Sequence, residues 1–121
     1  MRTMQLLEGL EFDEKRAHAS PLFVDKAGRV LCFALRPGQS LKEHAAPSSP
    51  LYLLVVKGEG IFAGGDGKER RLGPSSLAIL DRGEAHSIRA LDEDLVFLGI
   101  LHGEPTARTG KVAGKMARSG S

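Results

Sequence analysis

The chain has 121 residues, 41% hydrophobic and 26% charged, which suits one globular domain and leaves no room for two. Its single cysteine, Cys32, excludes an internal disulfide, and the apolar neighbours in VLCFAL predict a small buried side chain. The N-terminal MRTMQLLEGLEF lacks the apolar core of a signal peptide, and no apolar stretch approaches membrane-spanning length. We therefore expect a cytoplasmic protein without a membrane partner.

The positive charge is concentrated near the C-terminus. The net charge of the chain is +2, yet residues 1–102 contain 13 basic and 14 acidic residues, while residues 103–121 contain four basic and one acidic. The terminal segment is rich in Gly, Ser, Thr and Ala, so the sequence predicts a flexible basic tail over 103–121. Four charges without an aromatic residue are a weak signal for nucleic-acid binding, and we expect no nucleic-acid partner.

Short apolar runs separated by turn residues follow an N-terminal segment over 1–20, in which we expect at most a short helix near residues 4–11. The turns include PGQS, KGEG and the hairpin signal GGDGK. In chain order, we expect strands at 22–25, 29–36, 41–44, 51–57, 60–63, 69–72, 77–80, 86–90 and 95–101. Many short strands at this spacing predict an all-β sandwich or barrel over residues 21–102.

Two of the expected strands are apolar on both faces. In the strand over 51–57, Leu51, Leu53 and Val55 share one side, and the residues between them are also apolar. The strand over 95–101 has the same character. Both faces of such a sheet must be covered, by a second sheet and by an N-terminal strand or another subunit, so we predict a homodimer.

Two glycine–histidine patterns in this frame resemble the motifs of the cupins, small jelly-roll barrels. The first cupin motif runs glycine, five residues, His-x-His, a glutamate and a closing glycine; here Gly38 precedes His44, and Gly58 closes the stretch. The second ends in Pro-x-Gly-x-x-His, and DRGEAH supplies Gly83 and His86. The resemblance implies a double-stranded β-helix, or jelly-roll barrel, of the RmlC-like type over residues 21–102.

The chain departs from the cupin motifs at several positions. Ala46 stands where the second histidine is expected, and Leu51 where the glutamate is expected. Asp81 replaces the proline of the second motif, and Ala90 its final asparagine. Two of the four usual metal-ligand positions remain, His44 and His86.

Two imidazoles are too few for a firmly held metal, because a catalytic zinc uses three protein ligands. The sharpest metal hypothesis therefore adds His102, which ends the last strand, to His44 and His86. Such a site would hold a divalent ion, with zinc, nickel, manganese and iron as the candidates. The alternative for His44 and His86 is a metal-free polar pocket, and for His102 a surface position at the end of a strand.

The sequence thus predicts an internal pocket whose ligand is a small molecule. We expect it to be lined by His44, Leu51, Leu53, Val55, His86 and Ile88. Three functions stay open at this point: a small-molecule binding module, a metal-dependent oxygenase or isomerase, and a barrel that serves only as a dimer scaffold. No nucleophile–base arrangement in the sequence favours an assigned reaction.

Overall fold

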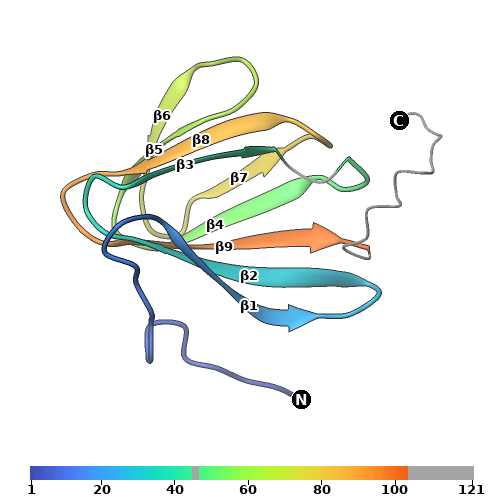
Figure 1. The fold of residues 1–121 in the computed structure, drawn as a ribbon. Helices are drawn as coiled ribbons and strands as arrows, with labels where there is room; N and C mark the ends of the chain where they lie inside the picture. The colour runs from blue at the N-terminus through green and yellow to red at the C-terminus, as the bar shows by residue number, and fades with distance from the viewer. Residues whose placement is uncertain (45–46, 104–121) are drawn as a thin grey trace.

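The strands form two packed sheets, as Figure 1 shows for the computed structural model, which describes residues 1–44 and 47–103 without the side chains of residues 43 and 44. The five-stranded sheet A has the order β1-β2-β9-β4-β7, and the four-stranded sheet B has the order β3-β8-β5-β6. Sheet A consists of β1 (His18–Val24), β2 (Gly28–Leu35), β9 (Leu95–His102), β4 (Leu51–Lys57) and β7 (Leu77–Leu80). Sheet B consists of β3 (Ser40–His44), β8 (Ala85–Ala90), β5 (Gly60–Ala63) and β6 (Glu69–Leu72).

Every neighbouring pair of strands is antiparallel, and the connections run between the two sheets except in the β1–β2 and β5–β6 hairpins. This confirms the all-β jelly-roll prediction. The first strand begins at His18, three residues before the predicted start of the barrel. The described residues contain no helix of the length and apolarity needed to cross a membrane.

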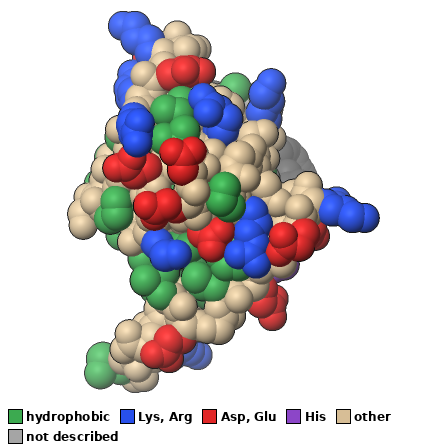
Figure 2. Space-filling view, turned by 90° about the vertical axis from the view of Figure 1, so that its left-hand side faces the viewer, with side chains coloured by type: hydrophobic (Ala, Val, Ile, Leu, Met, Phe, Trp, Pro, Cys, Tyr) green, Lys and Arg blue, Asp and Glu red, His purple; other side chains and the backbone are tan. Residues whose placement is uncertain are grey.

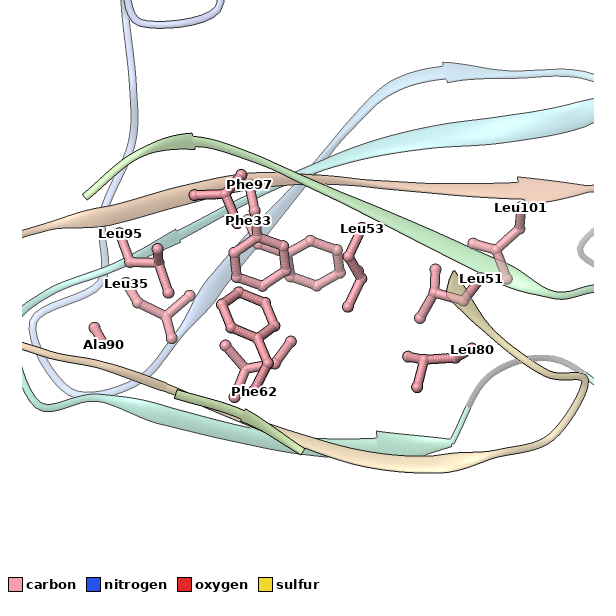
Figure 3. Close-up of a cluster of buried hydrophobic side chains, with 12 residues drawn as sticks. Phe33, Leu35, Leu51, Leu53, Phe62, Leu80, Ala90, Leu95, Phe97 and Leu101 are labelled. Carbon is pink, nitrogen blue, oxygen red and sulfur yellow. The ribbon is translucent and has the colours of Figure 1, made fainter. Parts of the chain in front are cut away.

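Alternation along the strands builds the core between the sheets. In β4, Leu51, Leu53 and Val55 are buried, and in β8 Ile88 and Ala90 face them from the other sheet. Figure 3 shows how these apolar side chains fill the space between the two layers.

Three aromatic rings occupy the middle of this core. Phe33 stacks on Phe97 with ring centroids 4.9 Å apart, and Phe62 meets Phe97 edge-on at 5.7 Å. A Cβ at Gly99 would lie 2.9 Å from the Phe33 ring, so glycine at this position leaves space for the stack. Phe97 is fully buried, which makes it the centre of the core.

The outer face of sheet A is partly covered by the N-terminal segment. Leu6, Leu10 and Phe12 pack against a second buried cluster of Cys32, Val96 and Leu98. The short helix allowed for residues 4–11 does not form: a single turn lies there and ends at Gly9, whose φ of 67° is left-handed. Burial raises the pKa of the Cys32 thiol, and the predicted buried cysteine is confirmed.

The N-terminal segment does not cover β7. Leu77 and Ile79 point outward from this edge strand and are 59% and 60% exposed. The predicted homodimer would cover them, and it stays a prediction. The predicted basic tail lies outside the described residues from position 104 onward.

The barrel has two ends, which we call the Arg36 end and the Arg29 end after the arginines at the two ends of β2. The Arg36 end comprises the turns over 36–39, 58–59 and 91–94, and the Arg29 end is where β3 and β9 end and β2, β4 and β8 begin. The Arg36 end lies at the left of Figure 1 and faces the viewer in Figure 2, where basic and acidic side chains lie interspersed. Arg36 contacts Glu14 at 3.0 Å and Asp94 at 3.2 Å, and Arg71 pairs with Glu59.

Candidate functional site

A cavity of about 300 Å³ lies at the seam where the two sheets are not hydrogen-bonded to each other. Its walls come from β6, the edge of sheet B, from β7, the edge of sheet A, and from the adjoining strands β5 and β8. Figure 1 shows the β5–β6 hairpin projecting above β8 and β7 at this seam. A hollow between two sheet edges is open to a ligand without breaking any strand pairing.

The inner wall of the cavity is apolar. Leu53 and Leu80 come from sheet A, and Phe62 and Ile88 come from sheet B. All four are buried members of the main core. The cavity therefore reaches from the surface into the hydrophobic interior, which is typical of small-molecule sites.

His86 is the buried titratable group of this wall, with 7% of its surface exposed. The β8 alternation turns its side chain inward together with Ile88. Its Nδ1 lies 3.4 Å from the backbone carbonyl oxygen of Glu84. Since a carbonyl only accepts, this contact favours the proton on Nδ1 and leaves Nε2 able to accept a hydrogen bond from a ligand hydroxyl or amide.

Charged side chains form the rim of the cavity. Arg70 of β6 donates to the Asp66 carboxylate at 2.9 Å. This hydrogen bond, together with one from the Lys68 backbone, lowers the pKa of Asp66 to about 2. Asp66 is therefore ionised at neutral pH, and Arg70 already has its counter-charge.

The Glu84 carboxylate fastens the β5–β6 hairpin to the turn before β8. Its Oε2 accepts from the backbone N–H of Gly65 at 2.7 Å, and its Oε1 accepts from that of Asp81 at 2.8 Å. These hydrogen bonds lower the pKa of Glu84. A Cβ at Gly64 would lie 2.6 Å from Oε2, so a larger residue there would displace the carboxylate from this position.

A wider hollow of about 490 Å³ lies beside the cavity. It shares Ala63, Gly64, His86 and Ser87 with the cavity and continues to Lys42. His86 and Ser87 thus lie where the two hollows meet. A ligand held at His86 can extend into either space.

The structure separates the predicted pocket residues into two groups. Leu53, His86 and Ile88 line the cavity. Leu51 and Val55 are buried in the core cluster beside them but are not part of the cavity wall.

The position of His44 is known only from its backbone. In the β3–β8 register, His44 lies opposite Ala85, and Glu43 lies opposite His86. The side chain of His44 is outside the described residues, as is Ala46. The convergence of His44 with His86 therefore stays a prediction.

His102 lies on a different surface. Its ring stacks on Tyr52 with centroids 5.3 Å apart, and it is exposed. Tyr52 alternates with the buried Leu51 and Leu53 and so stands on the outer face of sheet A, away from the cavity. The structure therefore does not bring the His102 ring to His86.

The described side chains do not assemble a metal centre. Within residues 1–44 and 47–103, no three His, Cys, Asp or Glu side chains gather closely enough to hold an ion. His86 is the one described imidazole at the cavity, two short of the three protein ligands that a catalytic zinc uses. The predicted site for zinc, nickel, manganese or iron does not fit the described residues on their own.

Sequence reasoning missed the polar rim. Arg70, Asp66 and Ser87 enter the cavity because β6 and β8 both border β5, a pairing that no local pattern reveals. Glu84 was visible as a turn residue, but its clasp on Gly65 depends on the hairpin folding back over the turn. The pair Gly64–Gly65 was the available signal, since it permits this close approach.

Several solved structures are similar to this chain over most of its length. A double-stranded β-helix domain protein from Klebsiella pneumoniae matches with a TM-score of 0.80 at 20% identity, over 87% of this chain and 92% of its own. An RmlC-like cupin from Desulfovibrio desulfuricans matches with a TM-score of 0.72 at 22% identity, over 83% and 95%. The Cupin_2 domain of an XRE-family transcriptional regulator from Enterobacter cloacae matches at 0.66 and 20%, over 73% and 97%.

These likenesses establish the fold. The chain has an all-β double-stranded β-helix fold, the fold of the RmlC-like cupins, as its motifs indicated. No family model matches the sequence, and no curated protein matches it. Identities of 20–22% show a shared fold but no shared chemistry, because one fold can hold many unrelated functional sites.

Proposed function

We propose that the protein binds a small organic molecule in the cavity between the β5–β6 hairpin, β7 and β8. The observation that carries this proposal is the position of His86, a buried imidazole in an otherwise apolar wall with one ring nitrogen directed to a backbone carbonyl. The ligand would place an apolar body against Leu53 and Ile88 and a hydroxyl or amide proton on His86 Nε2.

The test compares two histidines by thermal shift in the presence of a library of neutral phenols and alcohols. A ligand that binds only the native state raises the unfolding free energy by about 2.7 kcal/mol at one hundred times its Kd. We expect hits with the native protein and with His102→Ala, whose histidine is exposed on the outer face. His86→Ala should lose them, because the ligand proton would then have no acceptor.

Two outcomes count against this function. Equal stabilisation of His86→Ala and the native protein would show that the ligand binds elsewhere. No hit above the scatter of the assay would contradict a binding pocket of this polarity.

The alternative is a metal-dependent oxygenase or isomerase. The contact of His86 Nδ1 with a carbonyl favours it in one respect, because metal-ligating imidazoles usually direct the other ring nitrogen to such an acceptor. Elemental analysis of protein equilibrated with zinc, nickel, manganese or iron distinguishes the two. Stoichiometric metal that is lost in both His44→Ala and His86→Ala would replace the binding-module proposal with this one.

A further inference from the structure

Arg29 stands on the inner face of sheet A, in a row whose other described strand residues are apolar. The strand register aligns it with Val24 of β1 on one side and with Leu101, Leu51 and Leu80 of β9, β4 and β7 on the other. Directly opposed residues of neighbouring strands share a face, and all three leucines are buried in the main core. Arg29 is therefore the charged residue of a row that is otherwise apolar among the described strand residues.

The Nε atom of Arg29 is buried and has no hydrogen-bond partner among the described residues. Three other arginines of the described strands and turns differ from it: Arg36, Arg70 and Arg71 each contact a carboxylate. A buried donor without an acceptor costs free energy, and a charged one costs more. An acceptor on a bound molecule would remove this cost.

Arg29 is not part of the wall of the cavity or of the adjoining hollow, but it lies on the same inner face of sheet A, three strands from β7 of the cavity wall. Leu80, at the β7 end of its row, is part of the cavity wall. Figure 3 shows Leu101, Leu51 and Leu80 together at one end of the core, beyond the aromatic rings. Arg29 is thus a partly buried residue at the end where β4 and β8 begin, the same end at which His86 enters the cavity wall.

We infer that Arg29 is the anion-recognition residue of this protein, so that the ligand is an apolar molecule carrying a carboxylate or a phosphate. This inference rests on the proposed function and adds the chemical class of the ligand. The guanidinium presents a planar fork of N–H donors that matches both anions. Arg70 is less suited to bind a ligand anion, because its guanidinium is already paired with the Asp66 carboxylate.

The charge of Arg29 also bears on the choice between an anion and a metal. Like charges repel strongly away from bulk water, so an inward-facing guanidinium disfavours a second cation nearby and favours an anion. Leu51, in the same row, offers no carboxylate to offset this charge.

The experiment measures the affinities of three probes that share one ring: phenylacetate, phenyl phosphate and the neutral phenylacetamide. Titration calorimetry on the full chain compares the native protein with Arg29→Gln, Arg29→Lys and Arg89→Gln. Arg89 is the matched control, because it is exposed on the outer face of β8 and its loss changes the net charge equally.

The native protein should bind at least one anionic probe about tenfold or more tightly than the amide, the usual size of a charge-assisted hydrogen bond. Arg29→Gln should abolish this preference while the amide still binds. Arg29→Lys should keep part of it, since the charge remains without the fork. Arg89→Gln should behave as the native protein does. Preference for phenyl phosphate or for phenylacetate assigns the anion.

Equal affinities of the native protein for all three probes would overturn the inference while leaving the binding pocket in place. An anion preference that survives in Arg29→Gln would also overturn it. Binding of none of the three probes would count against both this inference and the proposed function. The circular dichroism of each variant shows whether it is folded, and Arg29→Lys still tests the inference if Arg29→Gln is not.

Discussion

Two arginines at the two ends of strand β2 differ in their contacts and in the direction that their side chains face. Arg36 lies just beyond the last residue of β2, donates to Glu14 and Asp94, and stacks 4.1 Å from the Phe12 ring centroid. These contacts raise its pKa, chiefly through the hydrogen bond to Glu14. Arg29, near the start of the strand, faces the core with its Nε unsatisfied among the described residues.

This difference indicates which end of the barrel contributes more to the stability of the fold. At the Arg36 end, the arginine joins the N-terminal segment to the turn after β8, and Leu35 and Leu95 beneath it are fully buried. At the Arg29 end, a partly buried arginine has its Nε without a partner among the described residues. We interpret the first as a structural closure and the second as a place kept for a ligand.

The largest expected effect tests the core that the Arg36 end closes. Phe97→Ala removes a fully buried ring that contacts Phe33 and Phe62, so unfolding should become easier by about 3–5 kcal/mol. Urea denaturation followed by circular dichroism measures this change. Phe23→Ala is the matched control: Phe23 is a surface phenylalanine of β1, and its loss should cost about 1 kcal/mol or less. Similar losses for both variants would contradict the assignment of the core.

The next effect concerns the hairpin over the cavity and its dependence on pH. Glu84 and Asp66 have pKa values below their ordinary values of 4.5 and 3.8. Their stabilising contribution is therefore complete above the ordinary values and is lost as the pH falls through the lowered ones. The Gly65 amide resonance should titrate at acid pH in the native protein.

Glu84→Gln should abolish that titration and lower the thermal midpoint at pH 7, because one charged acceptor of two backbone N–H groups is lost. Glu93→Gln, in the exposed turn before β9, is the control and should change neither quantity. A Gly65 amide that still titrates in Glu84→Gln would show that another carboxyl group holds the hairpin.

The smallest effect compares the two arginines directly. Arg36→Gln should lower the urea midpoint slightly, since it breaks contacts that join three segments but are largely exposed. Arg29→Gln should leave the midpoint unchanged or raise it, because it removes a partly buried charge that has no described acceptor. A loss of stability in Arg29→Gln as large as that in Arg36→Gln would assign Arg29 a structural role.

Most of the fold could be predicted from local patterns. The period of two groups Leu53 with its neighbours on one side of LYLLVVK and His86 with Ile88 in HSIRA, and the structure places all three on the inside. Turn glycines such as Gly38, Gly58 and Gly83 have positive φ, which explains why the strands end where expected. The N-terminal turn was harder, because Gly9 stops the helical pattern after one turn.

The candidate site could be predicted only in part. His86 stood out because DRGEAH resembles the second cupin motif. Arg29 and Arg70 did not, because their roles depend on which strands border them and on which carboxylates come within reach. The placement of His102 on Tyr52 likewise follows from the face of β9 that the register exposes.

The sequence by itself determined the architecture, since strand period, turn residues and apolar content are local properties that a jelly roll satisfies. The tertiary structure alone decided which charges found partners. Arg36 lies 22 residues from Glu14 and 58 from Asp94, and only folding brings them together. Electrostatic pairing depends on the distance between the charges in space and on their burial, and neither can be read from the order of the residues.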